Sequence, residues 1–107
     1  MESKYISNWT SQLKKGVLPY LVLSIVQERP FYGYELIKKI NQDFHTDVTD
    51  GTLYPILIRM YDEKILKYEW VEQSSGIPRK YYATTEKGTE IFGIMRSVIQ
   101  NLLNIEK

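Results

Sequence analysis

Two short segments of the chain carry hydroxyl and cationic side chains at spacings that suit contact with phosphate. Gly51 to Met60 reads as a helix with an apolar inner face, and its first turns carry hydroxyl groups. Pro78 to Tyr82 combines two cations with two aromatic residues in a pattern typical of a β-strand. A helix with polar early turns can enter the major groove of duplex DNA, while a basic hairpin lies on neighbouring phosphates. The candidate DNA contacts are Thr49, Thr52, Tyr54, Pro55, Arg59, Arg79 and Lys80.

Each of these side chains also has a purely structural interpretation. The threonines can serve as helix caps or ordinary surface residues. Arg59 can reach a phosphate, or it can pair with Asp62 or Glu63 on its own helix. Arg79 and Lys80 are neighbours in a strand and so point to opposite faces, and we expect Lys80 to be the one that reaches DNA.

Other kinds of chemistry find little support in the sequence. His45 is the only histidine and the chain has no cysteine, so we expect no metal site. No serine or threonine has a base partner at a suggestive spacing and no glycine-rich phosphate loop occurs, so we expect neither an enzyme nor a bound cofactor. Tyr81 and Tyr82 are adjacent in a strand, so they do not share a face on which single-stranded bases could stack.

Length and charge restrict the interpretation further. A chain of 107 residues predicts one domain with a single core. Its 14 Lys and Arg residues nearly balance 13 Asp and Glu residues, so DNA binding would need local segregation of the cations. The longest apolar run, Val17 to Val26, is interrupted by Pro19 and Ser24 and is shorter than the roughly 20 residues that span a bilayer. No signal peptide is evident, and we expect a soluble cytoplasmic protein without a membrane partner.

Apolar periodicity and turn residues predict the elements that position the candidate contacts. We expect helices over residues 9–27, 32–44, 49–64 and 85–104, with Thr49 or Asp50 as the N-cap of the third. Residues 65–72 and 79–84 are rich in strand formers, and Ser74-Ser75-Gly76 between them is typical of a turn. The predicted fold is mainly α with a small β-hairpin, that is, a winged helix-turn-helix.

The last predicted helix carries an apolar seam at heptad spacing. Its members recur at intervals of four and three residues and are Ile91, Met95, Val98, Leu102 and Ile105. A terminal helix this apolar, on so small a domain, predicts a homodimer in which the helix packs against a second copy of the chain. We therefore assign residues 1–84 to a winged helix-turn-helix unit with its N-terminal helix, and residues 85–107 to a dimerisation helix, within one structural domain.

Several motifs resemble the PadR family of bacterial transcriptional regulators. They are Tyr32-Gly33-Tyr34-Glu35-Leu36, Gly51-Thr52-Leu53-Tyr54-Pro55 followed by Leu57, Arg59 and Met60, Arg79-Lys80-Tyr81-Tyr82, and Thr85-Glu86-Lys87-Gly88 at the entry to the last helix. They occur in the family's order and spacing, and the chain length is similar to that of the short subfamily, which includes LmrR-like multidrug-responsive repressors. The resemblance implies a winged-helix homodimer on a pseudo-palindromic operator. It also implies repression that a small hydrophobic or phenolic molecule relieves.

Three positions depart from the family's pattern. Lys64 stands where glycine is usual, so the preceding helix must end without the residue that adopts the left-handed conformation most easily. Thr84 replaces a usual leucine. Ile99 lies where the LmrR type has an aromatic residue that sandwiches planar drugs. Trp9 on the first helix can supply an aromatic residue instead. We expect a ligand site between the first and last helices, lined by Trp9, Ile91, Met95 and Val98.

Two alternatives stay open at this point. The protein could be a winged-helix module that binds a protein partner through its last helix and never touches DNA, which the near-neutral charge favours. It could also be a small-molecule sensor without DNA binding. Salt dependence separates these classes, because phosphate contacts release counterions and make affinity fall steeply with salt.

Overall fold

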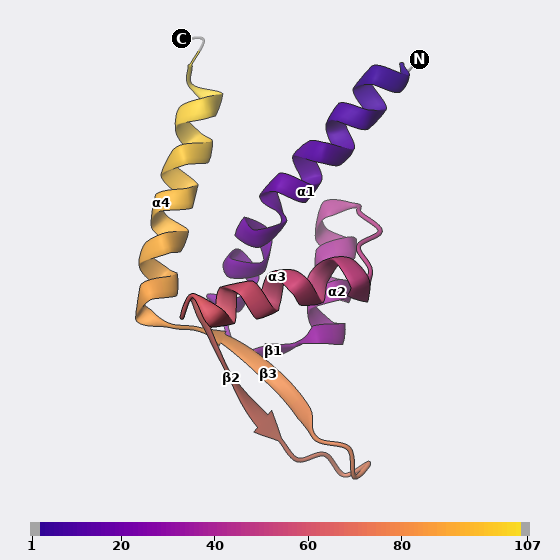
Figure 1. Ribbon diagram of the computed structural model, residues 1–107, viewed down its shortest axis with the longest axis vertical. Helices are drawn as coiled ribbons and strands as arrows, with labels where there is room; N and C mark the ends of the chain where they lie inside the picture. The colour runs from indigo at the N-terminus through magenta and orange to yellow at the C-terminus, as the bar shows by residue number, and fades with distance from the viewer. Residues whose placement is uncertain (1–2, 106–107) are drawn as a thin grey trace.

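The computed structural model, which describes residues 3–105, consists of four helices and a small antiparallel sheet whose hairpin projects away from them (Figure 1). In chain order the elements are α1 (Lys4–Val26), β1 (Phe31–Tyr32), α2 (Gly33–Phe44), α3 (Asp50–Asp62), β2 (Leu66–Val71), β3 (Arg79–Thr84) and α4 (Glu86–Leu103). The predicted mainly α fold with a β-hairpin is confirmed. None of the helices within residues 3–105 is long and apolar enough to span a bilayer.

The first helix begins earlier than its apolar pattern predicts. We expected a start near Trp9, whereas α1 begins at Lys4, with the Ser3 hydroxyl accepting a hydrogen bond from the Ile6 N–H at 3.2 Å. These first turns are exposed, so a cap rather than an apolar stripe marks their start. The helix then continues through Pro19.

A short strand that the sequence pattern did not reveal completes the sheet. β1 pairs with β3 in the register Phe31↔Tyr82 and Tyr32↔Tyr81, which gives an antiparallel sheet of order β1-β3-β2. Two residues are too few to show the alternation by which a strand is recognised. The consequence is that the start of α2 is tied directly to the hairpin.

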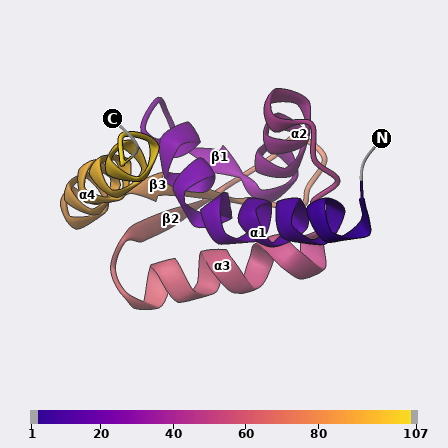
Figure 2. The ribbon, with the colours of Figure 1, turned by 90° about the horizontal axis from the view of Figure 1, so that it is seen from above.

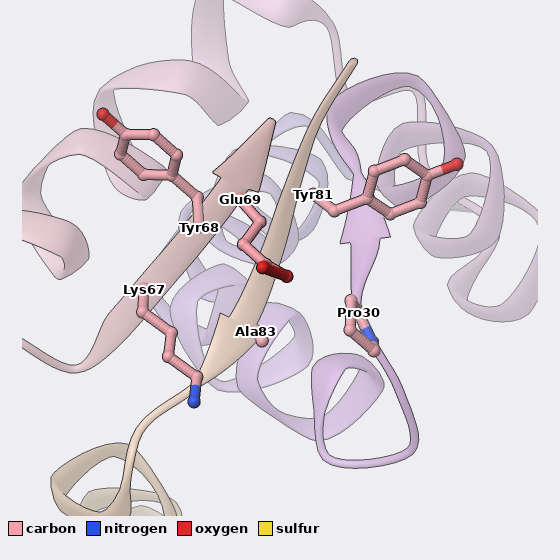
Figure 3. A pocket seen from close by; sticks show the side chains of 6 residues that line it. All are labelled: Pro30, Lys67, Tyr68, Glu69, Tyr81 and Ala83. Atoms are coloured by element: carbon pink, nitrogen blue, oxygen red, sulfur yellow. The ribbon is translucent and has the colours of Figure 1, made fainter. Parts of the chain in front are cut away.

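The hairpin, which we call the wing, has two different faces. Tyr68 and Tyr82 are opposite one another on the face that packs against α3, where the Tyr61 and Tyr68 ring centroids are 4.9 Å apart. The other face carries Lys67, Glu69, Tyr81 and Ala83 around an open depression of about 320 Å³ (Figure 3). The predicted alternation along β3 is therefore confirmed for Tyr81 and Tyr82.

One apolar core lies between α1, α2, α3 and the sheet. Apolar residues at helical spacing on α2 and α3 are fully or almost fully buried: Leu36, Ile40, Leu53, Leu57 and Met60. Phe44 and Leu13 also follow the apolar spacing of their helices, but they are 37% and 48% exposed. Phe44 is the last residue of α2, and Leu13 lies in the half of α1 that extends beyond the core.

The first and last helices form an open V. The rings of Tyr20 on α1 and Phe92 on α4 stack with centroids 5.2 Å apart. Beyond this contact the N-terminal half of α1 and the C-terminal half of α4 diverge, as Figures 1 and 2 both show. Apolar side chains along the free part of α4 and just after its end are exposed, namely Ile94, Val98, Leu102, Leu103 and Ile105.

Candidate nucleic-acid interface

A single asparagine sets the turn between α2 and α3. The Asn41 Oδ1 accepts hydrogen bonds from the Val48 N–H at 2.8 Å and the Thr46 hydroxyl at 2.7 Å. The Asn41 Nδ2 donates to the Val48 carbonyl at 3.1 Å. His45 lies in this turn, exposed and with a left-handed φ of 52°. The bonds fix the angle of the helix-turn-helix, a role that sequence reasoning missed because the partners are five and seven residues away.

The third helix presents one buried face and one free face. Thr49 is its N-cap, as predicted, but the side chain makes no capping hydrogen bond. Pro55 lies in the second turn, and its ring faces solvent. The residues on the free face include Gly51, Pro55 and Ile58, and all three are exposed. A helix exposed along this face can be inserted into a groove of DNA without disturbing the core.

A groove of about 480 Å³, which we call the wing groove, separates α3 from the wing. Its lining residues are Tyr32, Gly33, Tyr54, Ile58, Trp70, Pro78, Arg79, Lys80 and Tyr82. The Tyr54 hydroxyl rests directly against Gly33, where a Cβ would overlap it. The groove therefore brings Tyr54 of α3 together with Arg79 and Lys80 of the wing, three of the seven predicted contacts.

Both cations of the wing groove lie over aromatic rings. The Lys80 Nζ is 4.1 Å from the ring centroid of Tyr68 and 5.5 Å from that of Trp70. The Arg79 Cζ is 4.3 Å from the centroid of Tyr32. Cation–π contacts hold such groups in place without cancelling their charge. Within residues 3–105 neither cation belongs to an ion pair, so both charges remain available to an anion.

Arg79 and Lys80 reach the same groove although they are neighbours in a strand. Arg79 is exposed and folds back over Tyr32, whereas Lys80 is half-buried among the rings of the wing. Of the two, Arg79 is therefore the more accessible from solvent. Tyr82, which also lines this groove, is buried, and burial together with the nearby Tyr54 and Tyr68 raises the pKa of its phenol.

Two other predicted contacts lie away from the wing groove. Thr52 lines a smaller depression of about 130 Å³ that α1 and the α2–α3 turn enclose, beside Lys14 and Lys15 of α1. The Arg59 Nε lies 3.4 Å from a carboxylate oxygen of Glu63, and its side chain is 82% exposed. The intrahelical pairing considered for Arg59 is therefore present, with Glu63 rather than Asp62 as the partner.

Sequence reasoning missed two apolar members of the wing groove, Ile58 and Trp70. Both side chains are more than half exposed. Ile58 follows Tyr54 by one helical turn, so the helical period already placed the two on one face. Trp70 has no such signal, because its position beside α3 depends on how the wing packs.

The four residues expected to line a ligand site do not meet within one chain. Ile91 and Met95 pack against the core of their own chain. Trp9 is 53% exposed on the divergent half of α1, and Val98 lines an open depression of about 530 Å³ along α4. Among the residues that the structure describes, no three metal-binding side chains cluster.

Comparison with known proteins identifies the group to which this arrangement belongs. A model of the transcriptional regulator PadR-like family matches residues 22–93, more than half of the chain. A PadR-like transcription factor from Bacteroides fragilis is similar in structure, with 37% identity, a TM-score of 0.77, and 92% of this chain and 94% of that chain covered. A PadR family regulator from Eggerthella lenta has 34% identity and a TM-score of 0.79, with 94% and 83% covered. A PadR-like regulator from Bacillus cereus has 38% identity and a TM-score of 0.69, with 86% and 96% covered.

The matched range contains the helix-turn-helix, the wing and the start of α4. It therefore includes every motif on which the resemblance was based, and the resemblance is confirmed. Proteins of this group regulate transcription by binding DNA and are not enzymes, so the expectation that this chain is not an enzyme is confirmed as well. The chain belongs to the PadR-like family of transcriptional regulators.

Proposed function

We propose that the protein represses transcription as a homodimer on a pseudo-palindromic operator and that a small hydrophobic or phenolic ligand releases it. The observation that carries the DNA-binding part is the wing groove. There Tyr54 of α3 meets Arg79 and Lys80, two cations held over aromatic rings without an acidic partner within residues 3–105.

In this proposal α3 is the recognition helix and its free face enters the major groove. Thr49, Thr52 and Pro55 approach the DNA from the first two turns, and their contacts position the helix more than they read bases. Arg79 and Lys80 contact phosphates next to the major groove, with Arg79 the more accessible. Operator DNA is part of the chromosome, so we propose that the protein acts in the bacterial cytoplasm.

The dimer forms through α4 in this proposal. Val98, Leu102 and Ile105 supply the exposed part of the predicted seam, while Ile91 and Met95 continue it toward the body of the domain. Exposed apolar side chains repeated along one helix are what a partner helix covers. Two copies joined in this way would hold their recognition helices about one turn of DNA apart.

The ligand would bind between the first and last helices of the two protomers. Trp9, Ile91, Met95 and Val98 come from the two arms of the V, so only a second copy could complete a common pocket from them. A ligand there would favour one spacing of the recognition helices over another. Release from DNA follows if the favoured spacing does not match the operator.

The test is a salt titration of binding to a fluorescent duplex from the protein's own promoter region beside an unrelated duplex. We expect tighter binding to the promoter duplex and a steep fall in affinity between about 50 and 200 mM salt. Arg79→Ala should reduce the slope of log affinity against log salt by about one, and so should Lys80→Ala. Lys67→Ala, on the opposite face of the wing, is the matched control and should leave the slope unchanged.

Equal and feeble binding to both duplexes would overturn the proposal. That result would favour the alternative function, a winged-helix module that binds a protein partner through α4.

A further inference from the structure

One threonine hydroxyl joins the end of α3 to the start of α4. Thr85 is the N-cap of α4, and its Oγ1 accepts a hydrogen bond from the Gly88 N–H at 2.9 Å. The same hydroxyl lies 2.6 Å from the Lys64 carbonyl oxygen, to which it donates, and 3.0 Å from the Ile65 carbonyl oxygen. A hydroxyl has one proton to donate and two lone pairs to accept, so it can serve both helices at once.

Two further hydrogen bonds connect the start of α4 to the same turn. The Lys87 Nζ donates to the Glu63 carbonyl at 2.7 Å, and the Thr85 N–H donates to the Ile65 carbonyl at 3.2 Å. A Cβ added at Gly88 would overlap the Ile65 carbonyl oxygen. The first residues of α4 thus bind the carbonyls of Glu63, Lys64 and Ile65, three consecutive residues at a helix end that lacks intrahelical donors for them.

The turn that receives α4 is closed by hydrogen bonds of its own. The Lys64 N–H donates to the Tyr61 carbonyl at 2.9 Å, and the Ile65 N–H donates to the Met60 carbonyl at 2.8 Å. Together with the left-handed Lys64, these bonds form a Schellman motif, which closes the helix tightly. At this point the Thr85 and Lys87 side chains and the Thr85 N–H bind the backbone carbonyls of the closed turn directly.

We propose that Thr85 is a positioning residue for DNA binding: its hydroxyl fixes the angle between the recognition helix and α4. This inference depends on the function proposed above, in which α4 pairs the two copies and α3 enters DNA. A fixed angle within each chain then sets the spacing of the two recognition helices in the dimer. A change in the orientation of α4 would pass directly to α3 through this contact.

The test compares Thr85→Val, which keeps the shape but removes the hydroxyl, with Thr85→Ser, which keeps the hydroxyl. At a temperature well below the unfolding midpoint of either variant, we expect Thr85→Val to weaken binding to the promoter duplex about tenfold. Binding to an unrelated duplex, the salt slope and the dimer measured by ultracentrifugation should stay unchanged, because the substitution removes no phosphate contact and no contact between the α4 helices of the two copies. Thr85→Ser should restore promoter binding. Lys87→Ala, which removes only the bond to Glu63, should act in the same direction with a smaller effect.

A distance measurement tests the contact without DNA. The chain has no cysteine, so in a variant that carries both Asp62→Cys and Arg96→Cys these two positions would be the only ones to take a spin label. With labelled chains diluted in unlabelled protein, we expect a narrow distance distribution that Thr85→Val broadens and Thr85→Ser leaves narrow. Unchanged promoter affinity and an unchanged distance distribution in Thr85→Val would overturn the inference. Failure of the proposed function would look different, since the wild-type protein would then show no preference for its promoter.

Discussion

Lys64 holds a backbone conformation that lysine seldom adopts. Its φ is 63°, and a residue with a Cβ pays about 1–2 kcal/mol in the left-handed region. The conformation persists because the Lys64 and Ile65 N–H groups both find carbonyl partners in the last turn of α3. The departure from the family's usual glycine therefore changes the energy of this turn and not its shape.

Replacing Lys64 by glycine should stabilise the protein. Glycine removes the left-handed penalty but adds freedom to the unfolded chain, so we expect a net gain of about 1 kcal/mol in the free energy of unfolding. Chemical denaturation measures it. Lys64→Ala is the matched control, since it removes the same charge but keeps a Cβ, and its stability should stay close to that of the wild type. If alanine stabilised as much as glycine, the backbone argument would be wrong.

Tyr82 makes stability depend on alkaline pH. Burial, with Tyr54 and Tyr68 nearby, raises the pKa of its phenol above the ordinary 10.0. The folded state then holds this proton more tightly than the unfolded state does. The stability that the neutral phenol contributes is therefore complete below pH 10.0 and is lost as pH rises through the higher pKa of the folded state. Comparing urea unfolding at neutral pH and at pH about 11, we expect Tyr82→Phe to lose less stability than the wild type. Equal losses in both proteins would refute this origin.

At the scale of elements, the first part of α4 packs on the core of its own chain and the second part presents an exposed apolar surface. Ile91, Phe92 and Met95 pack on the core of the same chain, whereas Val98 and Leu102 are exposed. The heptad seam predicted from the sequence is thus divided along its length between the two surfaces. This division allows the assembly to be tested by substitutions that spare the fold.

Val98→Asp and Leu102→Asp should each weaken the proposed dimer. A buried carboxylate without a partner is costly, so we expect at least a hundredfold higher dissociation constant by analytical ultracentrifugation. The thermal midpoint of the isolated chain should change little, because both side chains are already exposed. Gln100→Asp adds the same carboxylate to another side of α4 and is the control. A dimer that survives both substitutions would show that the copies meet elsewhere.

The sequence could predict the elements in which many residues repeat one apolar pattern. The apolar period located α2, α3 and α4 because many residues of each contribute to one stripe. It could not locate β1, which has two residues, or the exposed first turns of α1, which Ser3 caps.

The candidate site could be predicted in part for a similar reason. Residue types pointed to Tyr54, Arg79 and Lys80, and the structure brings these three together. The pairing of Arg59 with Glu63, and the separation of Thr52 from the wing groove, depend on side-chain choices and tertiary packing that residue types do not report.

At the scale of the whole molecule, the two proposed tasks lie toward opposite ends. The long dimension of the chain is about 50 Å, with the tips of α1 and α4 at one end and the tip of the wing at the other (Figure 1). The recognition helix crosses between them. Such a shape lets two copies join through α4 while both wings and both α3 helices face the same DNA.

This geometry predicts a strict dependence on the spacing of operator half-sites. Two rigidly joined copies reach half-sites about one helical turn apart on one side of the duplex. Inserting about 5 base pairs between the half-sites moves one of them to the opposite side of the DNA. We expect affinity, measured by fluorescence anisotropy at constant salt, to fall to that of a duplex with a single half-site. Inserting a single base pair should cost less, because the rotation is smaller. A Val98→Asp variant that has become monomeric should bind all these duplexes equally, since it has no second recognition helix to align. If the wild-type protein tolerated the half-turn insertion, the rigid dimer would be wrong, and each copy would have to read its half-site alone.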